Sequence, residues 1–143
     1  MSNAEVLSRL DSAIKNIPDI KGVSNHEGSL ATEDPRLMEV IIREIGAKGL
    51  FFLDSATSQR SICQGVAKTA GTRFAKRDIF LDNNPSVGAV KKEMETLTRL
   101  AFRKGRAVAI CHDRKNTASA LSEMMPKMAA EGVEFVPVSE FAK

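Results

Sequence analysis

Apolar and polar positions form alternating blocks along the chain, and these blocks predict helices separated by short strands. Apolar residues recur at helical spacing in long segments that end near a glycine or a proline. The expected helices run over 5–16, from Thr32 or Asp34 to Gly49, over 61–70, over 86–104, and from Asn116 or Thr117 to about Gly132. Short apolar runs between them predict strands at 20–24, 50–53, 74–81, 107–111 and 133–138. Alternating strands and helices predict an α/β fold with a mainly parallel sheet, either open or part of a barrel.

Length and composition are those of one ordinary globular domain. The chain has 143 residues, of which 43% are hydrophobic and 27% charged. Residues 1–4 resemble the remnant of an expression tag, so we expect a single domain over 5–143. Tyr and Trp are absent and the net charge is only +3, which gives no reason to expect a nucleic-acid partner. No apolar run is long enough to span a membrane.

Three predicted strands end in ionisable residues, namely His26, Asp54 and His112. The carboxyl ends of parallel strands meet at one face of a sheet or barrel, where ligand sites form. Each histidine is a candidate metal ligand or general acid or base, and the alternative is an exposed loop histidine. Asp54 is a candidate for orienting a histidine, and the alternative is a turn or helix-cap aspartate.

Four further residues bear on these candidates. Arg77 and Asp78 are expected to form an ion pair, either near the site or as an ordinary exposed pair. Cys111 is next to His112, but neighbours on a regular strand point to opposite faces, so the two cannot form a nucleophilic dyad. We therefore interpret Cys111 as a small buried residue and Cys63 as a helix-face residue.

Four motifs follow one another along the chain. The first, GVSNHEGS at Gly22–Ser29, resembles the GVNNHMGS motif of the divergent polysaccharide deacetylase family. The other three are Phe52-Leu53-Asp54-Ser55 with Thr57 (FLDSRT in the family), Arg77 to Asn83 (RDVFLDN), and Ala107 to His112 with Thr117 (IAIGHP…T). The chain departs from the pattern at Glu27, Cys111 and Asp113, where the family has methionine, glycine and proline.

The resemblance implies a distorted (β/α) barrel that hydrolyses the N-acetyl groups of amino sugars in a polysaccharide. It implies a divalent metal ion, Zn²⁺ or similar, whose bound water attacks the acetamide. By the same resemblance His112 is the general acid, Asp54 its orienting partner and His26 a metal or substrate ligand. The motif positions expected to bind substrate are Asn25, Ser29, Ser55, Arg77, Asp78, Asp82 and Asn83.

The family's early strands, which carry an Asp-Asp motif and a further histidine, have no counterpart in this sequence. We therefore expect the C-terminal part of the barrel, incomplete on its N-terminal side. Exposed sheet edges would then be covered by a homo-oligomer or by a missing N-terminal half. The resemblance implies an extracytoplasmic or periplasmic location for the full-length family. The alternative function is a non-catalytic barrel half that binds glycan or completes a partner.

Overall fold

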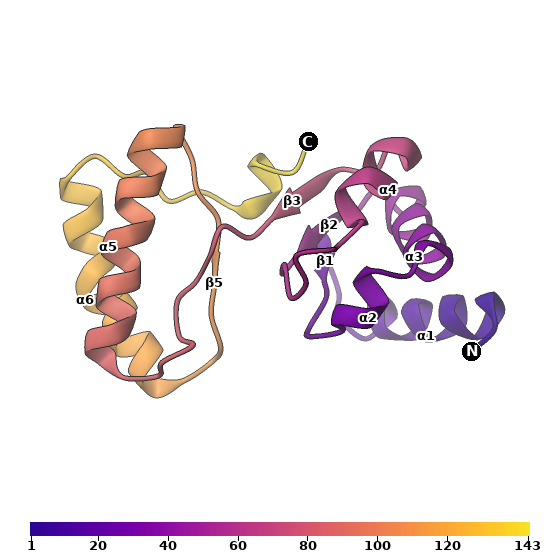
Figure 1. The fold of residues 1–143 in the computed structure, drawn as a ribbon, viewed down its shortest axis with the longest axis horizontal. Coiled ribbons are helices and arrows are strands. Elements are labelled where there is room, and N and C mark those ends of the chain that lie inside the picture. Colours follow the sequence, from indigo (N-terminus) through magenta and orange to yellow (C-terminus); the bar gives the residue numbers. More distant parts are fainter. The chain divides into compact units, whose positions relative to one another are not determined.

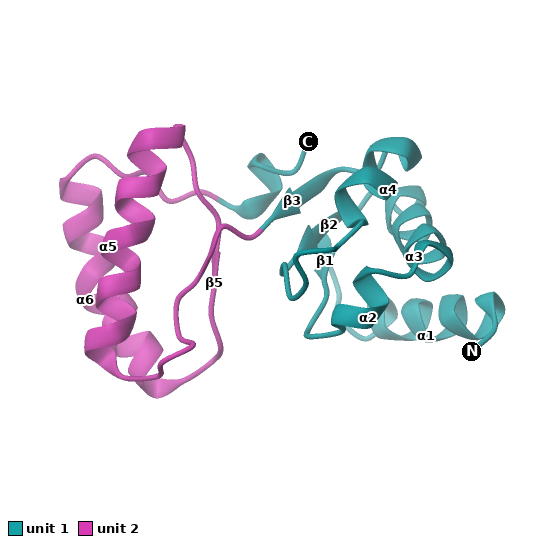
Figure 2. Ribbon diagram, viewed as in Figure 1, with its two compact units in different colours: residues 1–76, 137–143 teal, residues 77–136 magenta.

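The computed structural model describes residues 1–143, which divide into two compact units, each with its own hydrophobic core. Unit 1 comprises residues 1–76 and 137–143, and unit 2 comprises residues 77–136 (Figure 2). Both contain parallel strands and helices, so the predicted α/β class is confirmed. Compact units are not in themselves independent domains, and the single domain over 5–143 stays a prediction.

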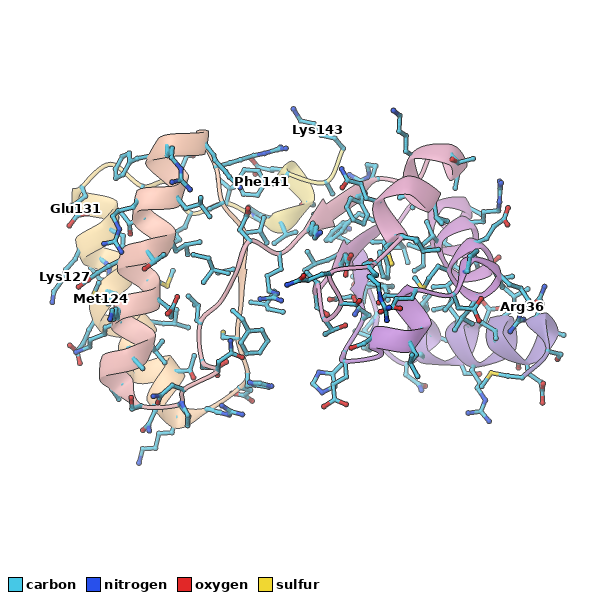
Figure 3. The ribbon with its side chains drawn as sticks, in the orientation of Figure 1. Arg36, Met124, Lys127, Glu131, Phe141 and Lys143 are labelled. Carbon is cyan, nitrogen blue, oxygen red and sulfur yellow. The ribbon has the colours of Figure 1, made fainter.

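Unit 1 is a parallel sheet of three strands covered by helices (Figure 1). The strand order is β1-β2-β3, and Val23 pairs with Phe52, which pairs with Phe74. At the outer edge of β3, Lys143 (labelled in Figure 3) exchanges backbone hydrogen bonds of 2.9 and 3.2 Å with Phe74. The elements are α1 (Asn3–Lys15), β1 (Gly22–Ser24), α2 (Ser29–Thr32), α3 (Pro35–Ala47), β2 (Phe51–Asp54), α4 (Cys63–Ala70), β3 (Phe74–Lys76) and the 3₁₀ helix η1 (Val138–Glu140).

Local chemistry explains where the helices of unit 1 begin. Asp34 caps α3, because its carboxylate accepts the Leu37 N–H at 3.0 Å and Pro35 supplies the first helical position. Ser2 and Glu5 form a reciprocal capping box at the start of α1. Residues that we interpreted as a tag remnant thus cap and begin a helix, and their origin stays a prediction.

The core of unit 1 lies between the sheet and the inner faces of α3 and α4. Phe52 on β2 is 2% exposed and packs with Ile42 and Ile45 of α3 and with Ala67 of α4. Cys63 belongs to this cluster and is fully buried, on the inner face of α4. The continuous apolar run predicted as a buried strand is therefore the central strand of the sheet.

Unit 2 consists of a parallel strand pair and two long helices that lie side by side (Figure 1). Its elements are β4 (Ile79–Phe80), α5 (Val87–Lys104), β5 (Ala109–Ile110) and α6 (Lys115–Ala130). The core is built by Leu81, by Val90 and Met94 of α5, and by Ala120 and Met128 of α6. No helix of the protein is long and apolar enough to cross a membrane, in agreement with the expectation from sequence.

Two predicted strands are wrong. The expected strand over 74–81 is two strands in separate sheets, because β3 pairs with β2 whereas β4 pairs with β5. Asp78, between them, already donates its N–H to the Val108 carbonyl at 2.8 Å. The expected strand over 133–138 does not form. The Val133 N–H donates a hydrogen bond to the Met128 carbonyl at 3.0 Å, so it is not available to a neighbouring strand. Phe135 is 44% exposed, and Pro137 has no N–H to donate.

The interpretation of Cys111 as a buried residue is also wrong. Cys111 is exposed, because β5 ends at Ile110 and the chain no longer follows the alternation of a regular strand.

Gly46 marks a close approach between α3 and the segment before β3, and it gives the first testable prediction. A Cβ at Gly46 would collide with Thr72 Oγ1, whose hydroxyl donates to Ile42 O at 3.0 Å in the core. We expect Gly46→Ala to lower the free energy of unfolding by about 1–3 kcal/mol, measured by urea denaturation. The matched control is Gly65→Ala in α4, where no atom lies within 4 Å of the added Cβ, so stability should rise by roughly 0.5–1 kcal/mol. Equal stability of the two variants would contradict this packing.

Candidate functional site

The strand pair of unit 2 brings Asp82 and His112 together. Ile79 pairs with Ala109 and Phe80 with Ile110, and the same offset of 30 residues, two positions further on, places Asp82 beside His112. His112 Nδ1 lies 3.1 Å from Asp82 Oδ1. The His112 backbone N–H donates to the same carboxylate, at 3.1 and 3.0 Å from its two oxygens. One carboxylate therefore holds both the backbone and the ring of His112.

Asp82 is a buried carboxylate whose hydrogen bonds favour the charged form. Its side chain is 0% exposed, and Thr117 Oγ1 donates to its Oδ2 at 2.8 Å. Burial raises the pKa of Asp82, but the hydrogen bonds from Thr117 and His112 outweigh it, so the pKa lies below its ordinary value. Arg114 donates to the Asp82 carbonyl at 2.9 Å and fixes the turn from outside. Asp82 is therefore an ionised, acceptor-only group facing the imidazole.

Aromatic contacts fix the ring of His112 from a second side. The Phe80 ring meets the imidazole edge to face, with centroids 5.0 Å apart and an interplanar angle of 64°. The Arg77 guanidinium lies over Phe80 at 5.3 Å from its centroid. The His112 side chain still keeps 38% of its surface exposed, so the imidazole can reach a ligand. An oriented and accessible histidine of this kind can transfer a proton.

The predicted Arg77–Asp78 ion pair is replaced by other contacts within unit 2. Asp78 pairs with Lys104 at 3.0 Å, and its second oxygen accepts the Val108 N–H at 2.9 Å. Asp78 therefore fixes the start of β5 in the way that Asp82 fixes its end.

In unit 1 the loops after β1 and β2 are joined by hydrogen bonds from Asn25, Ser29 and Thr57. Asn25 accepts the Ser55 N–H at 2.9 Å and donates to Glu27 O at 2.9 Å. Thr57 Oγ1 donates to Glu27 O at 3.1 Å, and Ser29 Oγ donates to Thr57 O at 3.2 Å. Asn25 and Ser29 thus shape the loop pair, and the substrate-binding roles of Asn25, Ser29 and Ser55 stay predictions.

Asp54 is buried at the end of β2 and acts locally as a turn residue. Its Oδ1 accepts the Ala56 N–H at 2.8 Å, and its Oδ2 accepts the Ser61 hydroxyl at 2.7 Å. These bonds hold Ala56 at a φ of 52°. The carboxylate that the structure places at His112 Nδ1 is Asp82, whereas the sequence analysis assigned that place to Asp54. Asp54 lies in the other unit, and a catalytic role for it stays a prediction.

A divalent metal ion needs several His, Cys, Asp or Glu side chains close together. His26 is exposed in the turn after β1. In neither unit do three side chains of His, Cys, Asp or Glu gather closely enough to hold a metal ion. Neither unit taken alone therefore provides a metal site, and His26 as a metal ligand stays a prediction.

Unit 2 also contains an open cavity of about 360 Å³ beside β4 and α5. Two of the predicted substrate-binding residues, Asp78 and Asn83, line it, and so does Phe80. Phe80 therefore lines the cavity and also contacts the His112 ring.

Sequence reasoning missed the supporting part of this site. It named Asp82 only as a substrate-binding residue and Thr117 only as a motif position. The signal was the 30-residue offset shared by the pairs Asp78–Val108 and Asp82–His112, but it has meaning only once β4 is known to pair with β5.

The fold and site define a class: an α/β protein in which parallel strands end in a carboxylate-held histidine. Within that class, the chain belongs to the divergent polysaccharide deacetylase family, whose model matches residues 1–142. The family predicted from the four motifs is therefore confirmed.

The relatives are themselves uncharacterized. An uncharacterized Haemophilus influenzae protein is 39% identical over 121 residues, which cover 85% of this chain and 43% of that protein. The uncharacterized protein YibQ of Escherichia coli is 30% identical over 125 residues, covering 87% and 39%. The crystal structure of an uncharacterized Agrobacterium tumefaciens C58 protein matches 99% of this chain and 58% of its own, with a TM-score of 0.97 and 26% identity. The chain spans about two fifths of the length of the two sequence relatives.

The charge state of Asp82 gives a pH-dependent prediction. Because its pKa is lowered on folding, the carboxylate stabilises the protein above its unfolded pKa of about 3.9. That contribution is lost as the pH falls through the folded pKa. We expect Asp82→Asn to lower the free energy of unfolding by about 1–3 kcal/mol near neutral pH, and this difference to shrink below about pH 4. Urea denaturation over a pH series measures both values.

The control is Asp113→Asn, an exposed neighbour of His112. Other carboxylates also have a lowered pKa, such as Glu33 and Glu123. They are the same in the native protein and in both variants, so they cancel when the free energies of unfolding are subtracted. A difference between native protein and Asp82→Asn that stays constant with pH would contradict the assigned charge state.

Proposed function

We propose that this protein takes part in hydrolysing N-acetyl groups of amino sugars in a polysaccharide, with His112 as the general acid. The observation that carries the proposal is the contact between His112 Nδ1 and the buried Asp82 carboxylate. A carboxylate at one ring nitrogen orients the imidazole and stabilises its protonated form, which leaves the other nitrogen to transfer a proton. Membership of the family supports the reaction class.

The proton transfer follows from the geometry of the ring. Water adds to the acetamide carbon and releases one proton to solvent. The C–N bond then breaks, and the departing sugar amine takes a proton from Nε2 of protonated His112. The products are a free amino sugar and acetic acid, which ionises to acetate; His112 regains a proton from solvent, so one proton is released per turnover. Asp82 stays ionised throughout, since its hydrogen bonds favour the carboxylate.

The cavity beside Phe80 is the proposed place of the sugar. Asp78 and Asn83 offer polar atoms in its wall and Phe80 an apolar one, the mixture that sugar sites use. Arg77, over Phe80, is proposed to hold that ring in place.

Removal of the proposed acid is the direct test. Acetate release from N-acetylated chitooligosaccharides is measured for native protein and for His112→Ala. We expect kcat/KM to fall by roughly 10²–10⁴-fold, the usual contribution of a general acid. The matched control, Asp113→Asn, changes a charge beside His112 without touching Asp82 or the ring and should retain the native rate. Equal rates for native protein and His112→Ala would exclude His112 as the acid.

A second candidate is non-catalytic glycan binding. It is supported by the open cavity of unit 2, whose wall contains Asn83. It predicts that chitooligosaccharides bind without acetate release. By calorimetry, Asn83→Ala should weaken binding by about three- to tenfold through loss of a hydrogen bond. Ser119→Ala, exposed on α6 and outside the cavity, should not weaken it. Acetate release by the native protein would rule out this second reading.

A further inference from the structure

Thr117 uses its hydroxyl differently from the other helical threonines. Thr69, Thr96 and Thr98 each donate to the backbone carbonyl four residues earlier, at 3.1, 3.1 and 2.9 Å, and Thr32 in α2 donates to the Ser29 carbonyl at 2.9 Å. Thr117, in the first turn of α6, donates instead to Asp82 Oδ2 at 2.8 Å, across 35 residues of sequence. It is 1% exposed, so water does not compete for this bond. A buried hydroxyl is thus directed at the carboxylate that holds His112.

The donors around Asp82 divide its two oxygens between them. Oδ2 accepts the Thr117 hydroxyl, whereas Oδ1 lies 3.1 Å from His112 Nδ1. The His112 backbone N–H bridges both oxygens. Since an ionised carboxylate only accepts hydrogen bonds, the ring nitrogen that faces it must carry a proton. Without the hydrogen bond from Thr117, the carboxylate could rotate. The preference of the imidazole for the tautomer with its proton on Nδ1 would then be weaker.

We propose that Thr117 is a positioning residue for His112: by holding Asp82, it keeps the imidazole proton on Nδ1, so that Nε2 is the nitrogen that exchanges a proton with substrate. The inference rests on the proposed function for its use in hydrolysis, but the position of the proton is a property of the protein alone. It can therefore be measured without substrate.

The test is the tautomer of His112, read from ¹H–¹⁵N spectra of protein labelled in histidine. The chain has two histidines, so His26→Gln assigns the His112 signals. Near neutral pH we expect neutral His112 in the native protein to carry its proton on Nδ1. Thr117→Val keeps the shape and removes the hydroxyl, and should raise the Nε2–H fraction by about tenfold. Thr117→Ser keeps a donor and should restore the native tautomer.

The matched control is Thr98→Val, which removes a buried hydroxyl of the same unit that does not touch Asp82. It should leave the His112 tautomer unchanged. A native His112 with its proton on Nε2 would overturn the proposal even if Thr117→Val failed to fold. A folded Thr117→Val with the native tautomer would overturn it as well.

Acetate release separates this inference from the proposed function. A native protein that shows the predicted tautomer but no hydrolysis contradicts the enzymatic role and leaves the role of Thr117 intact. A native protein that hydrolyses acetamides, but whose His112 carries its proton on Nε2, contradicts the role of Thr117 and leaves the enzymatic role intact.

Discussion

The buried carboxylate of Asp82 is the interaction on which the site of unit 2 depends. It is fully enclosed, yet it stays charged because a hydroxyl, a backbone N–H and an imidazole all point at it. A buried charge without these partners would be strongly unfavourable, so strand pairing, the start of α6 and the orientation of His112 form one connected arrangement. The same carboxylate holds the backbone at the end of β5 and the ring of the histidine that follows it.

The two units use carboxylates at strand ends in different ways. Asp54 of unit 1 accepts hydrogen bonds from the Ala56 N–H and the Ser61 hydroxyl of its own loop. Asp82 of unit 2 reaches across to the adjacent strand and helix. Both residues are aspartates at or just after the end of a strand, so only the hydrogen-bond partners show which part of the unit each carboxylate holds.

The sequence predicted what depends on local pattern and missed what depends on pairing. Leu50 to Leu53 has the continuous apolar character of a central strand, and β2 occupies that place. The apolar residues of 133–138 have the same character, but the Val133 N–H bonds back to the Met128 carbonyl in the last turn of α6 and Pro137 has no N–H, so no strand forms. Asp82 and His112 were both singled out, whereas their contact required the register of β4 and β5, which one sequence does not supply.

A crystal structure of this protein with an N-acetylated chitooligosaccharide tests the central claim most directly. The account predicts a sugar in the cavity beside Phe80, the acetamide nitrogen within hydrogen-bond distance of His112 Nε2, and Asp82 still at Nδ1. An acetamide bound away from His112, or a His112 ring turned so that Nε2 faces Asp82, would contradict it.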